Sequence, residues 1–200
     1  MHGLSRDPPQ GSRARASQSA ALRLRAPPGA GMNGRVVGLA LVAAGIVGGA
    51  AMYWLQVYAF YDRLPAQASF ALTPAGATAP LAVPLARFEG IDSDSSPIRY
   101  RACFQLAAPP AQPFTPYPDP TPLNAPGWFS CFDAAALGAA LAEGRAEAVL
   151  SEANIRFGID RVAVLFADGR GYAWTQINRC GQAHFDGNPL PPGCPPPPRS

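Results

Sequence analysis

The longest uncharged stretch of the chain lies near its start. Val36 to Tyr61 is a run of 26 residues without a charged side chain. A helix that crosses a bilayer needs roughly 20 apolar residues at a rise of about 1.5 Å each, so this run is long enough. Its far end carries the aromatic residues typical of a membrane–water interface: Tyr53, Trp54, Tyr58, Phe60 and Tyr61. We therefore predict a membrane anchor over residues 32–62.

A cleaved signal peptide is the alternative interpretation of this run. The apolar core of such a peptide spans about 7–15 residues, which is far shorter, although Ala66-Gln67-Ala68 has the small-x-small pattern of a cleavage site. Within the run, Gly45 and Gly49 are four residues apart and are candidates for close packing against a second helix. A GC-rich genome, which favours Gly and Ala codons, explains the same spacing without a partner.

Past the anchor the pattern changes to short segments with strand character. A hairpin gives the clearest signal, because Asp168-Gly169 supplies a turn between two apolar segments. Trp174 lies in its second strand and is predicted to anchor the core. Five segments are predicted to be strands from apolar content or from alternation with a period of two: 68–72, 81–91, 98–106, 160–166 and 172–177.

Two short helices are expected among these strands. Asp133 has the side chain of an N-cap, apolar residues repeat four positions apart after it, and Gly144 ends the segment. A second helical turn or two is predicted over 149–153. The predicted fold is therefore α+β: one N-terminal transmembrane helix, then a small disulfide-stapled domain of mainly antiparallel strands over 63–186. Residues 187–200 are predicted to form a proline-rich tail.

A proline-rich segment interrupts the predicted domain. Residues 109–126 hold eight prolines and are predicted to form a polyproline-like loop. Phe114 and Tyr117 within it are candidate contacts for a partner protein that docks on a stiff frame. The preferred interpretation is a surface excursion that a disulfide holds in place.

The charges fix an expected orientation. All 16 basic residues are Arg; six of them and one acid precede the apolar run, which gives +5, whereas ten Arg and twelve acids follow it, which gives −2. An Arg excess before the helix predicts a cytoplasmic N-terminus and a periplasmic domain on a bacterial inner membrane. A basic excess confined to this flank argues against nucleic-acid binding. Residues 1–31 are predicted to be a disordered leader, and Met32 is the expected start of translation.

Four cysteines lie beyond the apolar run, which favours disulfides in an oxidising compartment. Three pairings are possible, and we prefer Cys103–Cys131 with Cys180–Cys194 because each closes a proline-rich stretch. The sequence lacks a Cys-x-x-Cys motif, so a thioredoxin-type redox pair is not expected. Cys180 and His184 are spaced to touch a metal ion together, but no second pair converges on them, so no metal and no cofactor is predicted.

Catalytic patterns are weak throughout the sequence. Glu147 and Glu152 are more simply a solvated face than an acid–base pair. The segment 168–171, Asp-Gly-Arg-Gly, is followed by a strand, whereas a phosphate-binding loop opens onto a helix. No Gly-x-Ser-x-Gly motif marks a hydrolase. No catalytic residue is predicted.

Several segments of the chain resemble a family of small uncharacterised proteins from alphaproteobacteria. They are MNGR at 32–35, YWLQVYAFY at 53–61, RYRACF at 99–104 with the acidic turn before it, and GYAWTQIN at 171–178. The resemblance covers roughly residues 32–185. It implies a single-pass membrane protein with a bounded extracytoplasmic domain, and it implies no reaction.

Two classes of function are compatible with this sequence. The first is a non-catalytic accessory or interaction protein, which contacts the lipid bilayer and another inner-membrane protein. The second is a periplasmic ligand-binding or sensory module, in which a pocket near Trp174 and Tyr100 takes a small anion through Arg99, Arg101 and Arg179. A periplasmic enzyme of unrecognised type is a further alternative.

Overall fold

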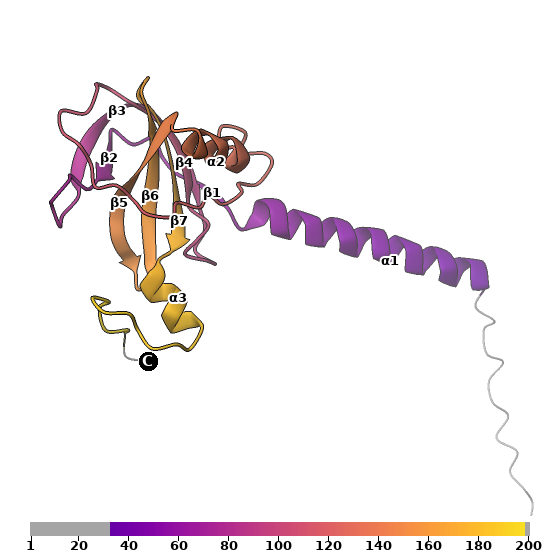
Figure 1. Ribbon diagram of the computed structural model, residues 1–200. Coiled ribbons are helices and arrows are strands. Elements are labelled where there is room, and N and C mark those ends of the chain that lie inside the picture. Colours follow the sequence, from indigo (N-terminus) through magenta and orange to yellow (C-terminus); the bar gives the residue numbers. More distant parts are fainter. Residues whose placement is uncertain (1–32, 199–200) are drawn as a thin grey trace, which may run out of the picture. The chain divides into compact units, whose positions relative to one another are not determined.

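The computed structural model describes residues 33–198 (Figure 1). The predicted disordered leader at 1–31 and the expected start at Met32 lie outside this range. The described chain opens with helix α1 (Gly34–Trp54), which continues as a π-helical turn, η1 (Leu55–Ala59). No residue of α1 is buried, and Gly34–Ala59 is long and apolar enough, by length and composition, to cross a membrane. The end of α1 belongs with the rest of the chain to one compact unit, Gly45–Ser200.

The domain is built on antiparallel strands, as predicted. The sheet order is β1-β3-β4-β7-β6-β5, and β2 pairs with β3 off this path. Two short helices, α2 (Ala134–Ala142) and α3 (Arg179–Phe185), accompany it near opposite ends of the strands (Figure 1). The strands are β1 (Asp62–Arg63), β2 (Ser69–Leu72), β3 (Leu81–Asp92), β4 (Arg101–Leu106), β5 (Ala146–Arg156), β6 (Ile159–Phe166) and β7 (Arg170–Ile177).

The sheet curls back on itself because β3 is bent. A register shift between Leu85 and Arg87 divides β3 into one half that pairs with β2 and one that pairs with β4. The bend brings β2 beside β5 at the other edge of the sheet, where Ser151 Oγ donates to the backbone oxygen of Ala71 at 2.6 Å. Thr73 Oγ1 donates to the Ser151 oxygen at 2.8 Å. The curled sheet therefore has an inner and an outer face.

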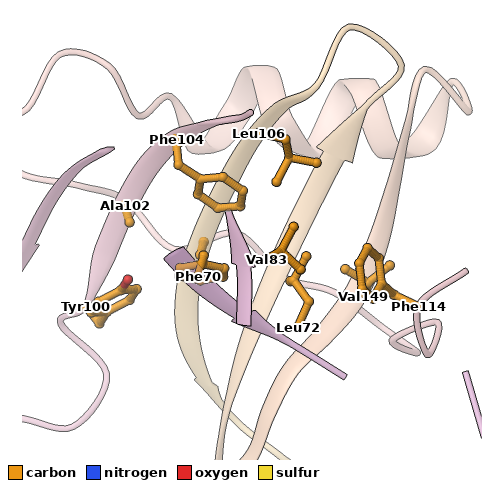
Figure 2. Packing of buried hydrophobic residues seen from close by; sticks show 11 residues of the cluster. Phe70, Leu72, Val83, Tyr100, Ala102, Phe104, Leu106, Phe114 and Val149 are labelled. Atoms are coloured by element: carbon orange, nitrogen blue, oxygen red, sulfur yellow. The ribbon is translucent and has the colours of Figure 1, made fainter. Parts of the chain in front are cut away.

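Each face of the curled sheet carries its own hydrophobic core. Side chains alternate between the faces, so that Ala173 and Trp174, adjacent in β7, pack in different clusters. Figure 2 shows the inner core, where Phe70 stacks on Phe104 with centroids 4.5 Å apart. The inner core consists of Phe70, Leu72, Val83, Tyr100, Ala102, Phe104, Leu106, Phe114, Val149, Ala163 and Ala173. The outer core, which α2 and the β4–α2 loop cover, consists of Ile91, Phe129, Phe132, Leu137, Val162, Val164 and Trp174.

The predicted helix at Asp133 and the predicted hairpin are both confirmed. Asp133 Oδ1 accepts a hydrogen bond from the Ala136 amide at 3.0 Å, and Gly144 follows the helix with a φ of +68°. The hairpin is β6–β7, and Trp174 within it is fully buried. The alternation predicted for 98–106 is also confirmed: Tyr100, Ala102, Phe104 and Leu106 share the inner face, although β4 itself begins at Arg101.

The helical turns predicted over 149–153 are wrong. This segment is the middle of β5, which forms a long hairpin with β6. Val149 faces the inner core while Ala148 packs against the outer one, a period of two that sequence alone did not separate from a helical pattern. The second short helix is instead α3, which Asn178 caps through its side-chain oxygen.

The proline-rich segment takes part in the sheet's closure, which the prediction of a surface loop did not include. The Thr115 amide donates to the Thr73 oxygen at 2.8 Å, and the Leu150 amide donates to the Thr115 oxygen at 2.8 Å. Tyr117 continues the pairing through its amide to Ala148. Residues 114–117 therefore lie as an extended segment between the end of β2 and β5.

Candidate functional site

Aromatic side chains from both sides of the helix–sheet junction pack together. Trp54 stacks on Tyr58 with centroids 5.0 Å apart, and Tyr58 stacks on Trp128 at 6.2 Å. Trp128 comes from the β4–α2 loop, and its Nε1 donates to the backbone oxygen of Val57 at 2.7 Å. Tyr61 meets Trp128 edge-on at 6.1 Å. We call this group, with Phe60, the aromatic collar: Trp54, Tyr58, Phe60, Tyr61 and Trp128.

Two arginines lie over rings of the aromatic collar. The Arg63 guanidinium lies 5.0 Å from the centroid of Trp128. The Arg99 guanidinium lies 5.6 Å from the ring of Phe60 and 5.4 Å from that of Tyr61. These separations are within the range of cation–π attraction. The junction therefore combines a group of aromatic rings with two guanidinium groups.

The connection between helix and sheet is very short. η1 ends at Ala59 and β1 begins at Asp62, so only Phe60 and Tyr61 lie between them. β1 pairs with the end of β3, and the Leu64 amide extends this pairing to the Gly90 oxygen at 2.8 Å. The sheet therefore holds the chain directly after the helix, without a flexible linker.

The side chains predicted to form an anion pocket are not gathered in one. Trp174 and Tyr100 are buried on opposite faces of the sheet. Trp174 Nε1 donates to Gln176 Oε1 at 3.0 Å. Arg99 lies at the aromatic collar, and Arg179 donates to the Pro192 oxygen beside the C-terminal disulfide. An anion therefore has no common site among these residues.

Arg101 is buried and its donors are already used. Only 4% of the residue is exposed, and burial lowers the pKa of its guanidinium to about 10. Its N–H groups donate at 2.7–3.0 Å to backbone oxygens of the segment just before β4 and of the β4–α2 loop. Arg101 thus fixes the loop to β4. The acceptors are Ile98, Tyr100, Leu123 and Asn124.

Phe114 and Tyr117 both pack against the domain, Phe114 in the inner core and Tyr117, which is half-buried, against the outer core. Phe114 is a buried member of the inner core. Tyr117 OH donates to Asp160 Oδ2 at 3.1 Å, and burial, together with this carboxylate, raises the pKa of the Tyr117 phenol. In this structure both residues attach the proline-rich segment to the domain.

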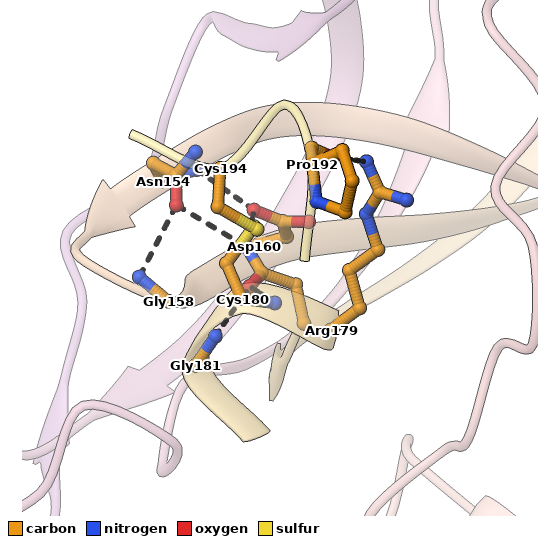
Figure 3. The surroundings of a disulfide bond; sticks show 9 residues. Asn154, Gly158, Asp160, Arg179, Cys180, Gly181, Pro192 and Cys194 are labelled. Carbon is orange, nitrogen blue, oxygen red and sulfur yellow. Dashed lines mark hydrogen bonds between the residues drawn. A yellow bond between two sulfur atoms is a disulfide. The ribbon is translucent and has the colours of Figure 1, made fainter. Parts of the chain in front are cut away.

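A polar cluster at the β5–β6 turn was not found from sequence. Asp160, which is buried, accepts hydrogen bonds at 2.8 Å from Asn178 Nδ2 and from the Asn154 amide. Asn154 has a φ of +49° and its side-chain oxygen accepts from the Gly158 amide (Figure 3). A cavity of about 400 Å³ borders the cluster. The only sequence signal was Asn178, a good N-cap type directly before α3.

The polar cluster mainly joins α3 to the sheet. Gly158 and Gly181 make a close backbone approach there, since a Cβ on Gly181 would lie 2.2 Å from the Gly158 oxygen. Asp160, Asn154 and Asn178 bond one another and nearby amides, so the polar atoms that form the cluster have partners within the protein. This pattern is typical of a structural joint.

The preferred disulfide pairing is confirmed. Cys103 is bonded to Cys131, 28 positions later in the sequence, and Cys180 to Cys194, 14 positions later. The first joins β4 to the loop before α2, and the second joins α3 to the tail (Figure 3). Over residues 33–198, no three His, Cys, Asp or Glu side chains come together in a group that could hold a metal ion.

Gly45 and Gly49 lie on the exposed surface of α1. No atom lies within 4 Å of a Cβ built at either position. The helix therefore leaves room for another helix to approach along this face.

The chain belongs to a family of unknown function, DUF6446, whose model matches residues 70–195. The match begins in β2 and ends just after Cys194, so it covers the sheet apart from β1 and the first residue of β2, both short helices and both disulfides. Membership agrees with the resemblance to an uncharacterised family. No match was found among curated proteins or among solved structures.

Proposed function

We propose that the chain is a membrane-anchored, non-catalytic accessory protein, whose domain lies on the periplasmic side of a bacterial inner membrane and contacts an inner-membrane assembly. The observation that carries the proposal is the direct attachment of the domain to the end of an apolar, unburied helix. Trp128 Nε1 donates a hydrogen bond to the backbone oxygen of Val57, and two residues separate η1 from β1. Such a domain is held at the membrane surface, where an accessory protein meets integral partners.

The periplasmic side is supported by the disulfides and by the charge asymmetry. Both disulfides lie on the C-terminal side of the apolar helix, and such bonds persist in oxidising compartments. The Arg excess before the helix favours retention of that end in the cytoplasm. The two arguments are independent and give the same orientation.

Reporter fusions test the orientation. A fluorescent protein that matures only in the cytoplasm is fused after Ser200, and alkaline phosphatase, which needs disulfides, is fused at the same place. We expect a dark fluorescent fusion and an active phosphatase. The fluorescent protein fused before Met1 serves as the bright control. Fluorescence from the C-terminal fusion would contradict the periplasmic assignment.

The helix partner is tested by site-specific photo-crosslinking in intact membranes. Met52 lies on the same helical face as Gly45 and Gly49, whereas Val47 lies on the opposite face, and both are exposed. A photoreactive side chain at Met52 is expected to give a discrete protein adduct, and one at Val47 only lipid adducts. Equal protein adducts from both positions, or none from Met52, would argue against a partner helix on this face.

A further inference from the structure

We propose that the aromatic collar, together with Arg63 and Arg99, is a binding surface for the phosphate groups of anionic phospholipids. The inference rests on the proposed membrane anchoring and adds the partner of the junction, which is the headgroup layer itself. The domain then binds the lipid surface through specific contacts, in addition to its covalent connection to the membrane helix.

The level of the collar follows from the length of the helix. Gly34–Ala59 comprises 26 residues, which at 1.5 Å per residue extend about 39 Å. The hydrocarbon core of a bilayer is only about 30 Å thick. The last turns of this helix therefore extend into the headgroup region, and Trp128 is bonded to one of them at Val57.

The rings of the collar remain accessible to lipid. Trp54 is 60% exposed, Phe60 44% and Tyr58 38%, although they stack on one another and on Trp128. Trp and Tyr favour the membrane–water interface because the ring takes an apolar environment while the N–H or O–H stays near water. An exposed group of rings at this level fits a lipid surface.

The two arginines have donors left for a phosphate. Among the ion pairs of the described chain, Arg99 has none, and its one side-chain hydrogen bond goes to Ser95 Oγ at 3.1 Å. Arg63 forms one ion pair, in which Nη1 donates to Glu89 Oε1 at 3.4 Å, and both side chains are about half exposed or more. A guanidinium that stacks on a ring keeps its planar N–H groups free to bind phosphate oxygens.

Bulk charge does not explain such an attraction. The sequence after the apolar run has a net charge of −2, so a domain without a local cationic site would be repelled by an anionic surface. A preference for anionic lipid must therefore come from local contacts. The effect of removing Arg63 and Arg99 should exceed that of removing two other exposed arginines.

The test uses the full chain in lipid nanodiscs and reads the fluorescence of Trp128. Trp54→Phe removes the other indole of the collar, which leaves half-buried Trp128 as the reporter. Trp174 is fully buried and out of contact with lipid. Lipids brominated near the headgroup quench indoles that they touch. We compare brominated phosphatidylglycerol with brominated phosphatidylcholine, each in a background of the unlabelled other lipid, and derive their relative association with Trp128.

We expect phosphatidylglycerol to associate more strongly by up to about 25-fold, since each of the two arginines near an anionic surface contributes about fivefold. Arg63→Gln with Arg99→Gln should bring the ratio to about one. Arg87→Gln with Arg156→Gln is the matched control, since both are exposed and the charge change is equal. A ratio of one in the parent protein, or an equal loss in the control, would overturn the inference.

Failure of this inference and failure of the anchoring are separable. Resistance of the chain to carbonate extraction from native membranes reports anchoring alone. Carbonate-resistant protein whose Trp128 is quenched by neither lipid would retain the anchor and assign the collar to a protein contact, against the inference. Extraction by carbonate would reject the anchoring as well.

Discussion

Removing the two disulfides one at a time is expected to have unequal effects on stability. The variants are Cys103→Ala with Cys131→Ala, and Cys180→Ala with Cys194→Ala. In the chain-entropy model, closing 28 residues contributes about 3.6 kcal/mol to the free energy of unfolding and closing 14 contributes about 3.0. If removing a disulfide changed only the entropy of the unfolded state, the two variants would lose similar amounts of stability.

The folded state makes the difference between the two bonds. The loop closed by Cys103–Cys131 contains Phe114 and Phe129, which are buried in separate cores, so it stays ordered when the bond is absent. The tail closed by Cys180–Cys194 has one side-chain hydrogen bond to the domain, from Arg179 to Pro192. Without the Cys180–Cys194 disulfide this tail gains conformational entropy in the folded state as well as in the unfolded state. The two gains largely cancel, so the free energy of unfolding changes little.

We therefore expect a loss of about 3–4 kcal/mol for the first variant and less than about 1 kcal/mol for the second. Urea unfolding of the full chain in detergent, followed by the fluorescence of buried Trp174, measures both. The oxidised parent protein is the reference. A loss above about 2 kcal/mol for the Cys180–Cys194 variant would show that the tail is part of the cooperative unit and refute the reasoning.

Three smaller predictions use the same urea assay. Arg101→Met should lower the free energy of unfolding by about 3 kcal/mol, because four backbone oxygens lose their donor, whereas exposed Arg87→Met should change it by less than about 0.5. Burial raises the pKa of Asp92, so the Asp92 carboxyl binds its proton more tightly in the folded state than in the unfolded state. The free energy of unfolding then falls as the pH rises from the ordinary carboxyl pKa through the raised pKa of Asp92. Asp92→Asn should remove this contribution to the pH dependence, which urea midpoints at acidic and neutral pH measure. An unchanged difference between the two midpoints would contradict this prediction. Gly181→Ala should cost about 2–4 kcal/mol because its Cβ meets backbone, while Gly127→Ala, which meets nothing within 4 Å, should be nearly neutral; equal effects would contradict the close approach.

Local sequence signals were sufficient where one segment contains its own partner. The β6–β7 hairpin could be predicted because Asp168-Gly169 supplies the turn and the apolar positions on both sides alternate. The helix after Asp133 could be predicted because its cap is three residues from the amide that it accepts from. The disulfide pairing followed from which proline-rich stretches needed closure.

Signals that depend on distant partners were missed or misread. The middle of β5 was predicted to be helical because the contacts that make it a strand come from other segments. It pairs with β6 on one edge and with residues 114–117 on the other. Arg101 was a candidate anion ligand in one of the two interpretations of the sequence, and in the structure its guanidinium donates to backbone oxygens more than 20 residues away. Nothing near Trp128 in the sequence indicates that its indole reaches Val57, 71 residues earlier.

The way in which the sheet closes also sets the order in which the domain can fold. The contact of β2 with β5 joins Ala71 to Ser151 across 80 residues. A polypeptide that emerges N-terminus first presents β2, β3 and β4 before β5, β6 and β7 exist, so the inner faces of the early strands stay open to water. Long-range closure of this kind is slow compared with helix formation. We therefore expect the nascent domain to depend on holding chaperones until β5 has been delivered.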